Sequence, residues 1–147
     1  MSRPVSLWSL LASLALGAAL LAPGCSAAPD KPDIVPGPTI PSLNLSGKWY
    51  SREFGDMQLV QQGKAVTGSY EDPRGPDHNG TVRGTIEGDL LRIEWIKAGN
   101  AAAAIMPARG RGYLRISRDA TKLDGKWGFD DDDSGGGPWR AEKSSFN

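Results

Sequence analysis

The sequence predicts an all-β domain, a small eight-stranded antiparallel up-and-down barrel, preceded by a signal peptide and a disordered proline-rich linker. Three observations favour this fold class. From Leu45 onward, apolar and polar residues alternate in steps of two, which is the period of a half-buried strand. Turn residues recur about every 8–12 positions. No segment of this part has the sustained 3.6-residue apolar period of a helix.

The alternation divides residues 45–147 into eight strands, joined mostly by hairpins. Leu91, Ile93 and Trp95 illustrate the pattern, because they share one face while their neighbours are charged. Gly63 and Gly88 fall where tight turns are needed. The predicted strands are 47–51, 57–61, 65–71, 81–87, 91–95, 113–117, 123–129 and 139–143. Closing such a sheet into a barrel removes the edge strands that would otherwise pair with other chains.

Four of these strands contain a glycine two places before a bulky residue on the same face. The pairs are Gly47/Trp49, Gly68/Tyr70, Gly84/Ile86 and Gly125/Trp127. Glycine inside a strand marks sharp coiling or close backbone approach. Small barrels also alternate small and large residues along their interior. The pattern therefore favours a barrel over an open sheet.

Residues 1–24 have the features of a signal peptide. Arg3 is their only charge, and the apolar run from Leu7 to Leu21 is too short to span a bilayer. The sequence Leu21-Ala22-Pro23-Gly24-Cys25 resembles the lipobox of bacterial lipoproteins, although its aliphatic residue lies four places before the cysteine. The resemblance implies that Cys25 receives diacylglycerol and becomes the new amino terminus. The alternative is an ordinary secretory signal followed by a free cysteine.

Residues 25–44 are predicted to be the lipid-anchor cysteine and a linker. Five prolines and few large apolar side chains lie between positions 26 and 43. Such a composition buries too little surface to offset the entropy of ordering, and proline favours an extended backbone. We therefore expect a semi-rigid spacer here and a domain that occupies residues 45–147.

Charge and cysteine content exclude several classes of site. Arg3 is the only charge removed with the signal peptide, which leaves one more acidic than basic side chain. This balance provides no long-range attraction to nucleic acid, so no nucleic-acid partner is expected. Cys25 is the only cysteine, so neither an intramolecular disulfide nor a thiolate metal cluster can form.

Short glycine-centred motifs of the first five predicted strands resemble those of the avidin and lipocalin barrels, the calycins. These motifs are Gly47-Lys48-Trp49-Tyr50, Gly55-Asp56, the run from Val66 to Glu71, and Arg92-Ile93-Glu94-Trp95. The resemblance implies a barrel that can enclose a small ligand. Ser51 and Asp56 stand where avidins carry residues that contact biotin. Because both differ, biotin binding is not expected.

Four aromatic residues are the candidate ligand-binding side chains: Trp49, Tyr70, Trp95 and Trp127. Inward-facing aromatics can wall a ligand pocket, since such pockets favour aromatic linings with a few polar groups. The alternative is that the same four rings fill the barrel as its core. Spacing alone does not choose between the two.

No catalytic, metal or cofactor site is predicted. The run from Asp130 to Asp133 lacks the spacing of a calcium loop and is interpreted as a solvated turn. His78, the only histidine, lies in a stretch that is predicted to be a loop. Catalysis needs rigidly held groups, so no catalytic role is predicted for it. The segment 98–111 is predicted to be the longest loop after the linker, with an apolar patch at 101–106 that is buried on the barrel or contacts a partner.

These features predict a membrane-tethered, non-enzymatic lipoprotein of the cell envelope that binds a small apolar ligand or an envelope protein. The membrane is contacted through lipidated Cys25, in the outer membrane if the bacterium has two, with the domain in the periplasm or at the cell surface. Two alternatives remain open. One is a lipid-anchored inhibitor of a hydrolase, and the other is a structural envelope protein with a filled barrel.

Overall fold

The computed structural model describes residues 33–99, 102 and 108–145. The predicted signal peptide, Cys25 and the first part of the linker lie outside these residues. The described residues from Ile34 onward belong to one compact unit. In the described part, no helix is both long and apolar enough to cross a bilayer.

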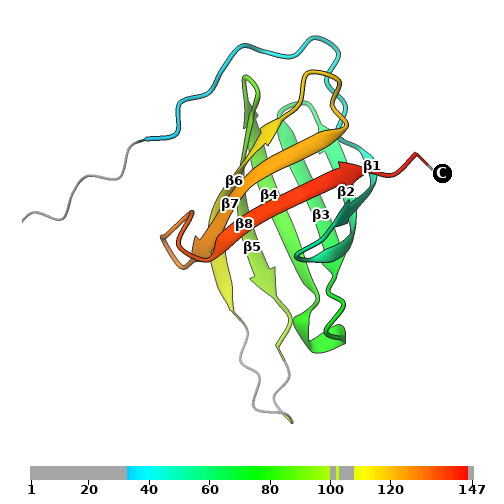
Figure 1. Ribbon diagram of the computed structural model, residues 1–147, viewed down its shortest axis with the longest axis vertical. Helices are drawn as coiled ribbons and strands as arrows, with labels where there is room; N and C mark the ends of the chain where they lie inside the picture. Colours follow the sequence, from blue (N-terminus) through cyan, green and yellow to red (C-terminus); the bar gives the residue numbers. More distant parts are fainter. Residues whose placement is uncertain (1–32, 100–101, 103–107, 146–147) are drawn as a thin grey trace, which may run out of the picture. The chain divides into compact units, whose positions relative to one another are not determined.

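Eight antiparallel strands follow one another around a closed barrel, which confirms the predicted fold class (Figure 1). The strands are β1 (Gly47–Ser51), β2 (Gly55–Gln62), β3 (Ala65–Glu71), β4 (Gly80–Glu87), β5 (Leu90–Lys97), β6 (Arg109–Ile116), β7 (Lys122–Phe129) and β8 (Gly137–Lys143). One 3₁₀ turn, η1 (Pro76–His78), lies between β3 and β4. β1 closes the barrel by pairing with β8, with Tyr50 opposite Glu142.

Inward-facing side chains of all eight strands form one hydrophobic core. In β2 the pattern is regular: Met57 and Leu59 are buried, whereas the alternate residues Gln58 and Val60 are exposed. The same alternation holds along most of the sheet, as the period-two pattern predicts. The predicted turns are also present, with Gly63 and Gly88 each at φ +60°.

The start of β6 differs from the prediction, which placed residues 98–111 in a loop. Arg109 and Arg111 belong to β6 and pair with Ile96 and Glu94 of β5. The inward position between them is Gly110, which supplies no apolar side chain and hence no strand signal. A Cβ at Gly110 would lie 2.6 Å from the indole of Trp95, so that ring fills the missing side chain's place. The apolar patch at 101–106 lies outside the described residues except for Ala102.

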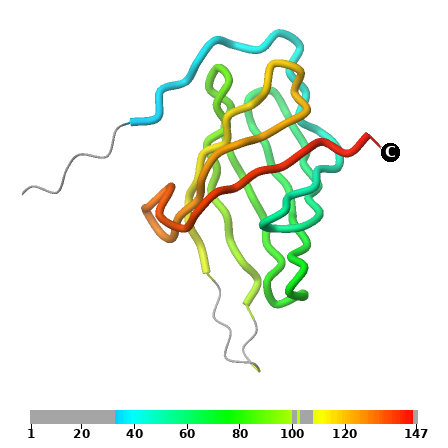
Figure 2. The backbone as a smooth tube through the Cα atoms, in the orientation of Figure 1, coloured from blue at the N-terminus to red at the C-terminus, as the bar shows by residue number. Residues whose placement is uncertain are grey.

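The connections between strands lie alternately at two ends of the barrel (Figure 2). We call one the strap end. It carries the β2–β3, β4–β5 and β6–β7 turns and is crossed by residues 34–44, the strap. We call the other the loop end, where the β1–β2, β3–β4, β5–β6 and β7–β8 connections lie.

The strap packs onto the barrel, so the compact unit starts before the predicted boundary at Leu45. Ile40 and Leu43 are partly buried against the core, and Leu45 is fully buried. The Gln61 side chain accepts from the Leu45 N–H and donates to the Leu43 carbonyl, at 2.8 and 3.1 Å. The Trp49 indole donates to the Leu45 carbonyl at 2.8 Å. Three well-spaced apolar side chains thus hold a proline-rich segment that its composition alone predicts to be disordered.

Candidate functional site

The four predicted ligand-binding aromatics all lie in or against the core. Trp49, Tyr70 and Trp95 are 1%, 2% and 3% exposed. Trp127 is half-buried and packs against the core. Trp95 and Trp127 stack edge to face at 5.6 Å, and the Trp95 indole donates to the Gly128 carbonyl at 3.2 Å.

Three further rings, which the sequence did not indicate as site residues, join Tyr70, Trp95 and Trp127 in an aromatic cluster at the loop end. The cluster consists of Phe54, Tyr70, Trp95, Trp127, Phe129 and Trp139. Phe54 comes from the turn between β1 and β2 and points inward, with its centroid 4.3 Å from that of Trp139. Trp139 could have been predicted as a member of the cluster, because it lies in a predicted strand. Phe54 carried no such signal, since alternation does not extend into a turn.

The barrel interior is filled by these side chains. The cavity among Met57, Leu91, Leu114 and Trp139 measures about 10 Å³. That is about the space of one water molecule, whereas ligand pockets measure roughly 300–1,000 Å³. The Trp139 indole N–H, which is buried, has no hydrogen-bond partner among the described residues. Binding of a small ligand by the four predicted aromatics stays a prediction, and it would require side chains to move.

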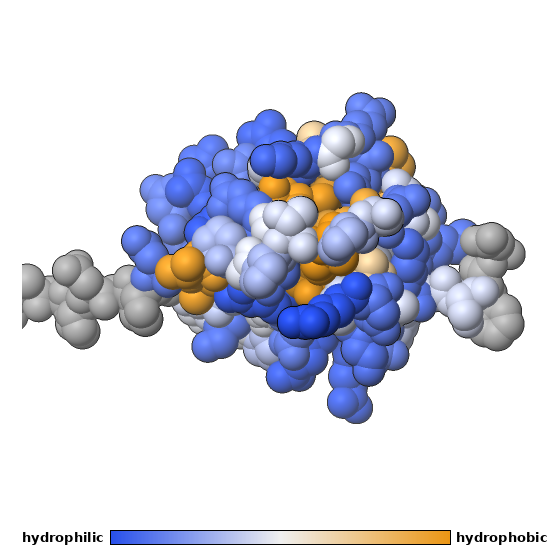
Figure 3. Space-filling view, turned by 90° about the horizontal axis from the view of Figure 1, so that it is seen from above, coloured by the Kyte–Doolittle hydropathy of each residue, from blue (hydrophilic) through white to orange (hydrophobic). Residues whose placement is uncertain are grey.

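Apolar side chains also pack against the core at the strap end. Figure 3 looks onto this end and shows hydrophobic surface near its centre, surrounded by hydrophilic side chains. Ile40, Leu43 and Ala120 are partly buried there and pack against the core. Ile40 and Leu43 of the strap thus pack over one end of the core, and Phe54 packs over the other.

A polar group of four side chains lies at the loop end: Tyr70, Asp72, Arg74 and Lys97. The Asp72 side chain is 1% exposed and forms an ion pair with Arg74, whose Nε donates to it at 2.8 Å. Burial alone would raise the pKa of Asp72, but hydrogen bonds from Arg74 and the charges of Arg74 and Lys97 lower it. Burial, followed by the Asp72 charge, raises the pKa of Tyr70 to about 12. Burial and then the Arg74 charge lower the pKa of Lys97.

This ion pair predicts an acid-sensitive contribution to stability. A carboxyl whose pKa is depressed on folding stabilises the protein above its ordinary pKa, and the contribution is lost as the pH falls through the folded value. We expect Asp72→Asn to lower the free energy of unfolding by about 1–2 kcal/mol at neutral pH. As the pH falls below the ordinary aspartate pKa and through the lower folded value, the variant and the wild type should converge. Urea denaturation across this range measures the difference, and Asp124→Asn, whose side chain is 73% exposed, is the matched control. A difference that is constant with pH would contradict the assignment.

The acidic residues 130–133 lie between β7 and β8, and His78 lies between β3 and β4. Asp131 pairs with Arg111 at 3.2 Å, and the Asp132 carboxylate accepts from the backbone N–H groups of Ser134 and Gly135. In the described part of the chain, no three His, Cys, Asp or Glu side chains form a group that could hold a metal ion. His78 lies in η1, and its buried Nδ1 has no partner among the described residues.

The outer wall of β3–β6 offers the larger concave surface. Two adjoining hollows of about 650 and 520 Å³ share Arg83, Glu94, Arg111 and Asp131 in their linings. Their charges are paired, with Arg83 Nη2 at 2.7 Å from Glu94 Oε2. Nearby Ile96 and Phe129 are 50% and 53% exposed. The surface therefore combines both signs of charge with apolar side chains, as protein-binding surfaces do. No protein-family model, curated protein or solved structure matches this chain.

Proposed function

We propose that this chain is a lipid-anchored, non-enzymatic module of the cell envelope, and that it binds a protein partner through the outside of its barrel. The observation that carries the choice of partner is the filled interior. A cavity of about 10 Å³ leaves no room for a carried ligand, whereas the hollows on the outer wall measure about 650 and 520 Å³. The barrel interior then serves as the structural core.

The anchor rests on the sequence of the export segment. An apolar run of signal-peptide length, Leu7 to Leu21, is closely followed by Gly24-Cys25, and this is the only cysteine in the chain. Three acyl chains on Cys25, as the lipoprotein resemblance implies, would hold the protein firmly at the membrane, since each buried CH₂ contributes about 0.8 kcal/mol. Inhibition of a hydrolase is one form that the protein contact can take.

Intact-mass spectrometry of the protein expressed in a bacterial host tests the proposal. Under denaturing conditions we expect the wild type to lack residues 1–24 and to carry added acyl mass. The Cys25→Ala variant should carry none. An unmodified wild-type product cut near residue 25 would overturn the anchor.

The same sample under native conditions tests the filled interior. We expect the mass of the polypeptide with its acyl chains and nothing else. A small molecule bound in a one-to-one ratio, and released on unfolding, would favour carriage of a ligand over protein contact.

A further inference from the structure

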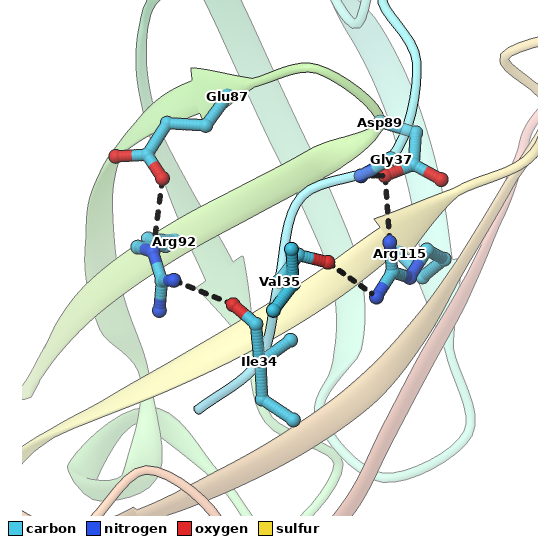
Figure 4. Close-up of polar contacts among 7 residues, drawn as sticks. All are labelled: Ile34, Val35, Gly37, Glu87, Asp89, Arg92 and Arg115. Atoms are coloured by element: carbon cyan, nitrogen blue, oxygen red, sulfur yellow. Dashed lines mark hydrogen bonds and ion pairs between the residues drawn. The ribbon is translucent and has the colours of Figure 1, made fainter. Parts of the chain in front are cut away.

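The first residues of the strap lie on the outside of the barrel, against β5, β6 and the turn that precedes β5 (Figure 4). Arg92 Nη2 donates to the Ile34 carbonyl at 2.7 Å. Arg115 Nη2 donates to the Val35 carbonyl at 3.1 Å. The Gly37 N–H donates to Asp89 Oδ1 at 2.7 Å. Three barrel side chains therefore hold three polar groups of the strap backbone between Ile34 and Gly37.

The three hydrogen bonds all use main-chain atoms of the strap. The Val35 side chain is 70% exposed, so it contributes little burial. Pro36 and Pro38 have no N–H, which leaves Gly37 as the donor between them. Proline also favours the extended conformation before binding, and this reduces the entropy lost on docking. The barrel thus recognises an extended backbone at this place.

The binding groups are held in position by their own partners. Arg92 is paired with Glu87 at 3.1 Å and Arg115 with Asp89 at 2.7 Å, so each guanidinium has one edge fixed while another donates to the strap. Burial would raise the pKa of Asp89, but hydrogen bonds from Gly37 and Arg115 lower it, which keeps the carboxylate ionised.

The fit between strap and turn is close on both sides. A Cβ added at Gly37 would lie 2.6 Å from Asp89 Oδ2, and one added at Gly88 would lie 2.0 Å from the Gly37 carbonyl oxygen. The strap backbone therefore leaves no room for a Cβ at Gly88, and a Cβ at Gly37 would displace the Asp89 carboxylate. Together with the fixed arginines, it makes the arrangement a shaped site and not a chance surface contact.

We propose that Asp89, Arg92 and Arg115 form a latch that binds the main chain of residues 34–37 and so sets how far the barrel can move from its anchor. The second part of this proposal rests on the lipid anchor at Cys25. Fully extended, the chain from Cys25 to Ile34 spans at most about 30 Å. If the latch opens as far as Leu43, that span rises to about 60 Å. The latch therefore halves the reach and keeps the strap end near the membrane.

Hydrogen exchange of the full-length protein in detergent tests the latch without reference to the anchor. We expect the Gly37 amide to be protected in the wild type. Asp89→Ala removes its acceptor and should raise its exchange rate at least about tenfold. Glu94→Ala is the matched control, because Glu94 pairs with Arg83 on the same wall and has no strap contact. Exchange of Leu91 in the same samples reports whether each barrel is folded, and Arg92→Ala provides a second opening variant. An unprotected Gly37 in the wild type, or protection that survives both variants, would overturn the latch.

Energy transfer to the membrane tests the reach. A donor dye is placed on Lys64→Cys at the strap end, and the acylated protein is inserted into phosphatidylethanolamine–phosphatidylglycerol vesicles that contain an acceptor lipid. We expect transfer to fall when Asp89→Ala is added and to stay unchanged with Glu94→Ala. Equal transfer in all three proteins would overturn the effect on reach. If Gly37 is protected but no protein carries an acyl group, the anchor and the reach fail together while the latch stands.

Discussion

Replacement of Phe54 by alanine is expected to lower the free energy of unfolding by about 3–5 kcal/mol. The ring is 6% exposed and lies among three other rings, with its centroid 4.3, 5.5 and 5.6 Å from those of Trp139, Trp127 and Tyr70. Its removal loses these contacts and leaves a cavity that the closed barrel cannot collapse to fill, because the surrounding strands are hydrogen-bonded on both sides. Urea denaturation followed by tryptophan fluorescence measures the loss.

Phe129→Ala is the matched control for this prediction. Phe129 also contacts Trp95 and Trp127, but it is 53% exposed, so we expect a loss of about 1 kcal/mol or less. The cavity in Phe54→Ala is apolar, and benzene should therefore raise the melting temperature of that variant but not of the wild type. A loss as small as that of Phe129→Ala would mean that Phe54 is not part of the core.

Gly125→Ala is expected to lower the free energy of unfolding by about 3 kcal/mol, at the upper end of the range for overpacked sites. A Cβ at this position would lie 1.8 Å from the Tyr113 carbonyl oxygen and 2.9 Å from the Leu114 Cα. Both atoms belong to the backbone of β6, so a rotamer change cannot relieve the clash. The β6–β7 pairing would have to separate locally.

Thermal and urea unfolding of Gly125→Ala should be compared with those of Lys126→Ala. Lys126 is the next residue in β7 and is exposed, so its truncation is expected to change stability by no more than about 0.5 kcal/mol. If Gly125→Ala is as stable as this control, the close approach of β6 and β7 at Gly125 is wrong.

Period-two alternation made most of the strands predictable. Leu91, Ile93 and Trp95 point inward in β5, and the turns at Gly63 and Gly88 fall where the sequence indicates them. Both signals are local, because a strand's two faces and a tight turn depend on a few neighbouring residues. The start of β6 was missed at Gly110, where the inward position is filled by Trp95 of the adjacent strand. The alternation within one strand does not indicate that a side chain of the neighbouring strand fills an inward position.

The candidate site was less predictable than the strands. The sequence identified Trp49, Tyr70, Trp95 and Trp127 as inward-facing, but it left open whether they line a pocket or fill the core. That question depends on volume, which is set by all eight strands together with Phe54 from a turn. The aromatic cluster contains side chains from five different elements, so no single segment carries its signal.

By itself, then, the amino-acid sequence determined the strand faces, the turns and the antiparallel order of successive strands, because each depends on residues that are near one another along the chain. Only the tertiary structure decided that the interior is filled and that residues 34–37 bind to the outer surface of the barrel. Gly37 and Asp89 are 52 positions apart, and Val35 and Arg115 are 80 apart. Contacts over such separations exist only after the barrel has closed and placed β5 and β6 beside each other, so local propensity carries no record of them.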